Sequence, residues 1–434
     1  MKQLYLGVAR EKITPEIGGQ LYGYNPDIRS ETVADDLNAT AFYFQQGDTK
    51  AVMVSVEVCL IHTQLSQKIL ALIEENFGIP KENGMLCATH THSGPNTAGE
   101  AGWGPIDQAY CDSIFVPKIL SAVGKAVENV QPVKMGTANG ISLVGINRRE
   151  LLDNNKVALG QNPWGPFNPQ MTVISFINDK GERVGNMIHY GAHGTAAGLN
   201  VEITRDWSGG MIDALENHSG AITAFFNGPQ GDVGPRLSNK KTTGDLSYVH
   251  EHSKMAAQDA VRIFDTITEY GDAKLSVSGK AVHLPLKKRM ALADAEKMYE
   301  TYKDATINIG GMIRTHLEEI IQSYQTGYVD AETVSVDQTV LALGDIVYAS
   351  CPYELFSEIG MRIDKAFPSK SVLTLSNTNG SEGYFITKDA VCRGGYEVDM
   401  FLYVHTQQYH DDVDFYLMQE TVKHIQSLEK ESEE

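Results

Sequence analysis

The chain has 434 residues, of which 42% are hydrophobic and 21% charged, a composition typical of a soluble globular protein. Its formal net charge of −19 argues against nucleic acid or an anionic membrane surface as a partner. The five cysteines are widely spaced with no Cys-x-x-Cys pair, there is no apolar leader, and no apolar run approaches the ~20 residues of a membrane span. We therefore expect a cytoplasmic protein with a small-molecule ligand, and the sequence does not exclude a homo-oligomer.

Short apolar runs rich in β-branched residues alternate with amphipathic helical patterns along the chain. The predicted strands are 51–58, 172–177, 184–190, 222–226, 339–343, 346–350 and 371–375. The predicted helices are 63–77, which a Gly-Ile-Pro stop ends, 114–130 and 253–267. This alternation predicts an α/β fold with layered mixed sheets in a single domain over residues 1–434. A helical excursion over 291–325 interrupts it, either as a lid beside a site or as plain scaffold.

The segment CATHTHSGPNT (87–97) places two histidines just after a predicted strand end at 85–88. His90 and His92 are two residues apart, and positions i and i+2 of a strand point to the same side. Histidine is the commonest metal ligand, but a hydrogen-bonded structural pair gives the same short pattern. The motif alone therefore leaves metal binding and a structural role open.

Four further segments rich in glycine and polar residues also follow predicted strands. They are MIHYGAHGTAAG (187–198), FFNGPQGDVGPR (225–236), SCPYELFSEIG (350–360) and LSNTNGSEGYFIT (375–387). Gly191 and Gly194 argue against a helix in the first, so we expect His193 on a loop and His189 within the sheet. Because α/β proteins bind ligands at strand ends, the sequence predicts that these segments meet at one site.

Taken in order, these motifs resemble the catalytic domain of the neutral (non-lysosomal) ceramidase family. The resemblance is carried by GVAREKITPEIGGQLYGY, ATHTHSGP, INRR, AHGT, NGPQGDVGPR, PYELFSEIG, GYFIT and GGYE. It implies the layered mixed-sheet fold of that domain and a zinc ion held by His90, His193, Glu354 and Tyr384. It also implies that the groups that handle the substrate, as catalytic or binding residues, are His92, Arg148 and Tyr396.

The implied chemistry is coherent. Two imidazoles and a carboxylate are standard zinc ligands, whereas a phenolate is an unusual fourth. Zinc lowers the pKa of a bound water to about 7 and polarises a carbonyl oxygen. We therefore predict a zinc-dependent hydrolase that uses a metal-activated water on a small polar amide, lactone or ester, with His92 orienting the water, relaying a proton or stabilising the oxyanion. The alternatives are a ceramide amidohydrolase and a catalytically inactive zinc-containing binding protein.

The sequence departs from the family at three positions near these motifs. Gly234 stands where the ceramidases carry a serine, Arg236 replaces an asparagine, and Tyr353 stands where a glycine is usual. Glycine offers no nucleophile, so we expect water to attack, and we expect the backbone at Gly234 to form a substrate-binding wall. The family's immunoglobulin-like domain and secretion signal have no counterpart in these residues.

The remaining polar groups carry weaker expectations. Asp206 and Glu57 either orient a ligand histidine or make structural hydrogen bonds, while Asn227 and Asp232 are expected only to hold the turn of their loop. Two further expectations concern solvated groups: the charged helix around His250 and His252 predicts an exposed face, and Arg149 is predicted to be a solvated neighbour of Arg148.

Overall fold

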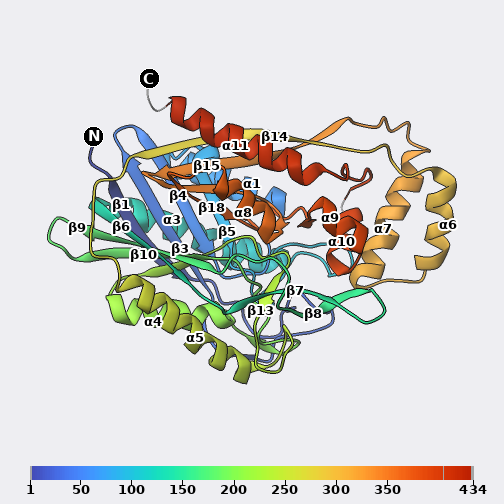
Figure 1. Ribbon diagram of the computed structural model, residues 1–434, viewed down its shortest axis with the longest axis horizontal. Coiled ribbons are helices and arrows are strands. Elements are labelled where there is room, and N and C mark those ends of the chain that lie inside the picture. The colour runs from blue at the N-terminus through green and yellow to red at the C-terminus, as the bar shows by residue number, and fades with distance from the viewer. Residues whose placement is uncertain (1, 404, 432–434) are drawn as a thin grey trace.

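The computed structural model describes residues 2–403 and 405–431 and confirms the predicted α/β fold with several mixed sheets. In Figure 1 the sheets form the middle of the molecule. Helices α4 (Trp207–Ser219) and α5 (Leu246–Phe264) lie below them, and α11 (Val413–Glu431) lies above.

The largest sheet has eight strands in the order β12-β10-β9-β6-β1-β3-β4-β5. In chain order these are β1 (Tyr5–Lys12), β3 (Asn38–Gln46), β4 (Thr49–Val56), β5 (Gly84–Ala88), β6 (Gln131–Ile141), β9 (Gln170–Asn178), β10 (Arg183–Tyr190) and β12 (Thr223–Asn227). Its two four-stranded halves are joined by a short β1–β6 pairing, in which Tyr5 and Leu6 lie opposite Pro132 and Gln131. This corner lets the two halves fold toward each other.

The folded-over half brings the edge strand β12 back to β4 and β5. Ser55 Oγ donates a hydrogen bond to the carbonyl oxygen of Phe225 (2.6 Å), and Asn227 Nδ2 donates to the carbonyl oxygen of Thr89 (2.9 Å). The strand end before the His-x-His motif therefore lies beside the strand end that opens the NGPQGDVGPR loop.

A four-stranded sheet with the order β14-β15-β16-β18 packs against the large sheet. Its strands are β14 (Leu275–Pro285), β15 (Thr333–Leu343), β16 (Ile346–Ser350) and β18 (Ser371–Leu375). Phe42, Phe226 and Tyr348 belong to the apolar core between the two sheets. The other face is covered by α11 and α8 (Ser357–Lys365). β16 and β18 are parallel, so the segments that follow them, which carry Glu354 and Tyr384, leave the same edge.

Helices α1 (Thr63–Phe77) and α3 (Val116–Glu128) pack on the β3-β4-β5 part of the large sheet, and α4 and α5 pack on β9-β10-β12. α1 has its predicted bounds and ends at Gly78, whose φ of 62° suits glycine. α3 is preceded by α2 (Gln108–Tyr110) and a π-helical turn η2 (Cys111–Phe115). α5 begins earlier than predicted because the Asp245 side chain accepts a hydrogen bond from Ser247 N and caps it.

Three small sheets join the loops of the strand ends. They are β13-β7-β8, β11-β2 and β17-β19. Their strands are β2 (Thr32–Val33), β7 (Gly145–Leu151), β8 (Val157–Asn162), β11 (Glu202–Ile203), β13 (Val233–Pro235), β17 (Glu354–Leu355) and β19 (Tyr384–Phe385). Their pairings hold the residues of the candidate site in register. The remaining short elements are η1 (Lys81–Asn83), α9 (Lys388–Arg393) and α10 (Tyr396–Leu402).

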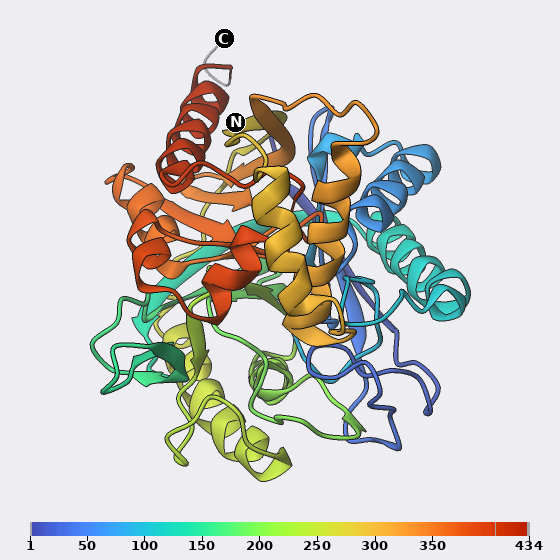
Figure 2. The same cartoon turned by 90° about the vertical axis from the view of Figure 1, so that its right-hand side faces the viewer.

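The helical excursion is confirmed as the hairpin of α6 (Leu292–Tyr302) and α7 (Asn308–Ser323), whose helices run side by side in Figure 2. At the start of α7, Asn308 N donates to the carbonyl oxygen of Gly102 (2.6 Å). A side chain at Gly102 would meet Asn308 O at 2.2 Å, so glycine allows this close approach. The hairpin is thereby attached to the loop that follows the His-x-His motif.

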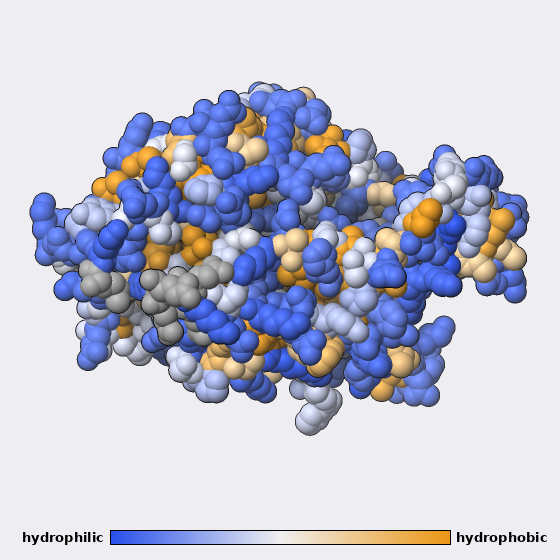
Figure 3. Space-filling model, turned by 90° about the horizontal axis from the view of Figure 1, so that it is seen from above, coloured by the Kyte–Doolittle hydropathy of each residue, from blue (hydrophilic) through white to orange (hydrophobic). Residues whose placement is uncertain are grey.

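The upper face of the molecule is covered mostly by hydrophilic side chains, with hydrophobic ones in small groups (Figure 3). Among residues 2–403 and 405–431, no helix combines the length and apolar composition that a membrane crossing requires.

Candidate metal centre

Two histidines from different strand ends are held by their Nδ1 atoms. His90 follows β5 with a φ of 70°, an uncommon backbone conformation for a residue other than glycine, and its Nδ1 lies 3.0 Å from the carbonyl oxygen of Cys59. His193 lies on the loop after β10, as predicted, with its Nδ1 2.8 Å from the carbonyl oxygen of Gln230. A carbonyl can only accept a hydrogen bond, so each Nδ1 carries the proton and each Nε2 is left with a lone pair.

These lone pairs converge on the carboxylate of Glu354. Its Oε2 lies 3.2 Å from His90 Nε2 and 3.0 Å from His193 Nε2, and the ligand atoms of the three residues all lie within 4.8 Å of one another. All three side chains are buried, and Glu354 Oε2 has no hydrogen-bond partner among the residues that the structure describes. Three buried acceptor atoms that face one another are unfavourable unless a cation lies among them. The donor set therefore fits a metal ion.

His193 is suited to hold a metal at neutral pH. Burial, together with the positive charge of Arg148, lowers the pKa of His193 to about 3, so its imidazole is neutral. Cys59 Sγ, 3.5 Å from His90 Nδ1, is a further candidate ligand, and Cys59, His90 and His92 form a second cluster. Burial raises the pKa of the Cys59 thiol well above its usual value, which disfavours the thiolate that a metal needs.

Tyr384 lies at the edge of the cluster. It stands opposite Glu354 in the parallel β17–β19 pair, and its hydroxyl is 3.4 Å from His193 Nε2. The same hydroxyl accepts a hydrogen bond from Arg148 NH2 (2.8 Å). Burial raises the pKa of Tyr384 well above its usual value, although Arg148 acts in the opposite direction. The fold thus brings Tyr384 to the cluster, and its role as a fourth ligand stays a prediction.

His92 lies beside the cluster with a defined tautomer. Its Nδ1 is 3.2 Å from the carbonyl oxygen of Gly23, so this nitrogen carries the proton. Its Nε2 lies 3.2 Å from His90 Nε2 and therefore presents a lone pair toward the cluster. Burial lowers the pKa of His92 well below its usual value, so the ring is neutral and its Nε2 is a hydrogen-bond acceptor.

Arg148 and Arg149 share one buried carboxylate. Arg148 Nε donates to Glu397 Oε1 (2.8 Å), and Arg149 NH1 donates to Glu397 Oε2 (2.6 Å). Arg149 also donates to the carbonyl oxygen of Gly394 (2.6 Å). The prediction that Arg149 is solvated is therefore wrong: it is 8% exposed and binds the carboxylate oxygen of Glu397 that Arg148 does not bind. Glu397 is not predicted from the sequence, although it stands next to Tyr396 in the GGYE motif.

Tyr396 opens α10 and packs edge-on against Tyr384, with 5.9 Å between the ring centroids. Its predicted contact with substrate stays a prediction. A second carboxyl group that is not predicted from the sequence is Glu100, which accepts hydrogen bonds from Tyr22 OH and Ser381 Oγ, both 2.7 Å. Burial raises the pKa of Glu100. It stands ten residues after His90 in the same loop, but no spacing rule marks it.

Gly234 lies in β13, opposite Ile146 of β7. A Cβ atom at Gly234 would lie 2.6 Å from Thr242 Cγ2 and 3.5 Å from Arg148 Cβ. The methyl group of Thr242 thus fills the space that a side chain at 234 would need. The neighbouring Val233 carbonyl lies 3.1 Å from His193 Nδ1, which places this strand beside the cluster. Substrate binding by Gly234 stays a prediction.

Gly234→Ser should destabilise the protein without creating a nucleophile. The new side chain collides with Thr242, and overpacking of this kind costs about 1–3 kcal/mol. Thermal unfolding should show a lower Tm, and Thr242→Gly in the same chain should restore it. Mass spectrometry of a quenched reaction of Gly234→Ser should detect no acylated protein. A single variant with unchanged Tm would show that Thr242 moves aside.

The expectation that Asn227 and Asp232 only hold the turn of their own loop is wrong, because both side chains join separate segments. Asn227 donates to the carbonyl oxygens of Thr89 (2.9 Å) and Ala192 (3.2 Å), which ties together the loops of both histidine motifs. The carboxylate of Asp232 accepts hydrogen bonds from Ser357 N (2.7 Å) and Asn147 Nδ2 (3.2 Å). It thereby ties the GDVGPR loop to the segment that follows Glu354.

Asp206 and Glu57 make structural hydrogen bonds. The carboxylate of Asp206 accepts from the backbone N–H groups of Ala196, Ala197 and Trp207, so it caps α4 and fixes the loop after His193. Glu57 Oε2 accepts from Asn38 N (2.6 Å) and Nδ2 (3.0 Å). Neither carboxylate has a described hydrogen bond to a ligand histidine ring within residues 2–403 and 405–431.

The histidines outside the site divide between surface and core. His250 is exposed, as predicted, but His252 is 0% exposed and packs edge-on against Trp207 of α4. The predicted exposed face is therefore wrong for His252, because α5 turns this position toward α4. His189 lies within β10, as predicted, and its Nε2 is 2.9 Å from the carbonyl oxygen of Thr374.

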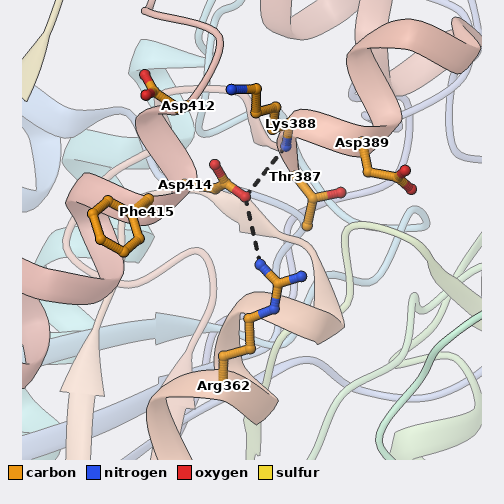
Figure 4. Close-up of a pocket in the computed structure, with 7 residues that line it drawn as sticks. All are labelled: Arg362, Thr387, Lys388, Asp389, Asp412, Asp414 and Phe415. Carbon is orange, nitrogen blue, oxygen red and sulfur yellow. Dashed lines mark hydrogen bonds and ion pairs between the residues drawn. The ribbon is translucent and has the colours of Figure 1, made fainter.

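A surface pocket near the start of α11 stands apart from this cluster. It is lined by Arg362, Thr387, Lys388, Asp389, Asp412, Asp414 and Phe415 (Figure 4). Asp414 accepts a hydrogen bond from Lys388 N (3.2 Å) and lies 3.8 Å from Arg362 NH1. These contacts tie α8, α9 and α11 together, and none of the predicted site residues lines the pocket.

Comparisons with known proteins support the family resemblance that the sequence motifs carry. A family model described as neutral/alkaline non-lysosomal ceramidase, N-terminal, matches residues 4–276. The neutral ceramidase of Pseudomonas aeruginosa is 28% identical over 230 residues, which cover 50% of this chain and 34% of that protein. Neutral ceramidase A of Dictyostelium discoideum is 29% identical over 218 residues, covering 45% and 30%. The matched region thus spans about a third of the length of these curated relatives.

The fold extends the likeness beyond the matched sequence. The crystal structure of neutral ceramidase from Pseudomonas aeruginosa superposes with a TM-score of 0.75 at 20% identity, over 97% of this chain and 74% of that one. A second structure, described as ceramidase complexed with C2, gives a TM-score of 0.75 at 18% identity. The layered mixed-sheet fold that the motifs implied is therefore confirmed. By the match over residues 4–276, this chain belongs to the neutral/alkaline non-lysosomal ceramidase family.

Proposed function

We propose that this protein is a zinc-dependent hydrolase in which water attacks a small polar amide, lactone or ester. The observation that carries the proposal is the convergence of His90 Nε2, His193 Nε2 and Glu354 Oε2 in a buried cluster. Two imidazoles and one carboxylate form a common catalytic zinc set, which leaves a coordination position open. Membership of the ceramidase family supports a hydrolytic reaction.

His90, His193 and Glu354 would hold the ion, with Tyr384 at a fourth position. When bound, zinc supplies Lewis acidity, which polarises a carbonyl oxygen and makes water a better nucleophile. The hydrogen bonds from the histidines to the Cys59 and Gln230 carbonyls fix the ring orientations and raise the basicity of each Nε2.

His92 would move the proton of the reaction. Its Nδ1–H is engaged by Gly23 O, so only Nε2 can act as a base. As the water oxygen bonds to the acyl carbon, Nε2 takes the proton released from water. The same proton then passes to the leaving nitrogen or oxygen as its bond to the acyl carbon breaks, so His92 returns to its neutral form.

Arg148 would hold the substrate. Glu397 engages its Nε and Tyr384 its NH2, so the guanidinium is fixed before substrate arrives. A donor fixed in advance stabilises developing negative charge without reorganisation. Tyr396, beside Tyr384, would contact the polar substituents of the substrate.

Replacing Arg148 with alanine should lower kcat/KM by at least ~10-fold, equivalent to about 1.4 kcal/mol of transition-state binding. The zinc content should stay at the wild-type level because Arg148 is not a ligand. Arg183→Ala, which removes an arginine packed on Phe264 away from the cluster, is the matched control and should leave kcat/KM unchanged. Wild-type kinetics in Arg148→Ala would remove this residue from the site.

The test of the proposal combines metal analysis with a substrate screen. Purified protein should contain one zinc per chain, and it should hydrolyse at least one compound among N-acyl amino compounds, sugar lactones and short-chain ceramides. Short-chain ceramides are included to test the alternative of a ceramide amidohydrolase, which the relatives named neutral ceramidase support. Tightly bound zinc without turnover in any arm would favour a binding protein. Protein without zinc would refute the proposal.

A further inference from the structure

The segment Gly23-Tyr24 packs against His92. Gly23 has a φ of 121°, in the region that favours glycine, and a Cβ atom there would lie 2.4 Å from His92 Nδ1. Its carbonyl oxygen lies 3.2 Å from the same nitrogen. Only glycine permits this approach, so the backbone of the segment forms a wall of the site beside His92.

The ring of Tyr24 continues this wall. Its centroid is 5.1 Å from that of His92, which in turn is 4.7 Å from that of His90. Tyr24 therefore lies beside His92, to which the proposed function assigns the proton transfer of the reaction.

The hydroxyl of Tyr24 is buried and has no hydrogen-bond partner among the described residues. Other buried phenols near the cluster are satisfied: Tyr22 OH donates to Glu100, and Tyr384 OH accepts from Arg148. A buried polar group without a partner costs stability, and such groups persist where a ligand supplies the partner. Burial raises the pKa of Tyr24 well above its usual value, so the group is a neutral O–H donor.

We propose that Tyr24 is a further substrate-contacting residue whose hydroxyl donates a hydrogen bond to the acyl oxygen of the substrate. This inference rests on the proposed function. The protonated phenol has a hydrogen to donate, and its ring lies beside His92, which the proposed function places next to the reacting carbonyl. The hydrogen bond strengthens as that oxygen becomes negative, so Tyr24 acts more on kcat than on KM.

The test is Tyr24→Phe, which deletes only the hydroxyl. We expect kcat/KM to fall at least ~10-fold, mainly through kcat, with wild-type zinc content. Tm should be equal to or above that of the wild type because an unsatisfied polar group is removed. The matched control is Tyr110→Phe: Tyr110 OH donates to the carbonyl oxygen of Ile13 (2.6 Å), so its loss should lower Tm and leave kcat/KM per zinc unchanged.

A second measurement does not require turnover. Acetohydroxamate carries an acyl oxygen, and calorimetric titration should show at least ~5-fold weaker binding to Tyr24→Phe than to wild type, the loss expected for one hydrogen bond of about 1 kcal/mol. Unchanged kcat/KM or unchanged hydroxamate affinity would overturn the inference. A fall in Tm matching that of Tyr110→Phe would assign Tyr24 a structural role instead.

The two proposals fail in different ways. If the wild type binds zinc but turns over none of the screened compounds, the hydroxamate titration still decides the role of Tyr24. If the wild type binds no zinc, the proposed function fails first and the inference about Tyr24 falls with it. If wild type turns over substrate and Tyr24→Phe does so equally well, only the inference about Tyr24 fails.

Discussion

Replacing His90 or His193 with alanine should remove the metal and lower kcat/KM by about 10³-fold or more. In the proposed function, each substitution deletes one of three converging candidate ligand atoms, and the Lewis acidity lost with the ion would stabilise the transition state by several kcal/mol. Elemental analysis of the purified variants gives zinc per chain, and initial rates on the best substrate of the screen give kcat/KM.

The matched control for this experiment is His189→Ala. His189 is also buried, but it lies within β10, its Nε2 is hydrogen-bonded to the carbonyl oxygen of Thr374, and it is not one of the clustered residues. Its loss should lower Tm while zinc content per folded chain stays at the wild-type level. Full zinc occupancy in both His90→Ala and His193→Ala would show that the zinc lies elsewhere.

Replacing Glu397 with alanine should destabilise the protein by about 3–5 kcal/mol, the range for breaking a buried ion pair, because Arg148 and Arg149 lose their shared carboxylate. The activity of the folded fraction should also fall, since Arg148 is no longer fixed beside Tyr384. Glu397→Gln keeps the shape and loses the charge, so its effects should be intermediate. Urea unfolding and kcat/KM per folded chain measure the two effects.

A suitable comparison is Glu11→Ala. Glu11 also bridges two cations, but the side chains of Lys118 and Lys125 are 47% and 58% exposed, so solvent weakens the pairs. The loss of stability should be clearly smaller than for Glu397→Ala. Equal losses in the two variants would mean that the buried bridge contributes no more than a surface one.

The apolar strands could be predicted from sequence, whereas the half-polar strands could not. The predicted bounds of 346–350 and 371–375 agree with the observed ones because both sheet faces are buried there. β14 is not predictable because it is an edge strand with several exposed positions, and β6 because it carries two glycines and a proline. In α4, Gly209 and Gly210 obscure the helical pattern.

The candidate site could be predicted in part for a similar reason. His90, His193, Glu354 and Tyr384 each follow a strand, and the structure brings them together. The burial of Arg149 could not be predicted, because its partner Glu397 lies 248 residues away along the chain. The burial of His252 could not be predicted either, because its neighbours in the sequence are charged and its packing partner, Trp207, lies on α4.

The bent eight-stranded sheet and the sheet packed on it bring together residues that lie far apart in the sequence, and this affects how the protein folds. The candidate metal cluster is formed by residues far apart in the sequence, and Asn377 contacts the ring of His90 although the two are 287 positions apart. Long loops of this kind close late, and folds dominated by distant contacts form slowly. During synthesis both histidines emerge well before Glu354, so the nascent chain holds only part of the candidate ligand set. Uptake of the proposed zinc ion should therefore coincide with the last step of folding and mark the point at which the chain becomes native.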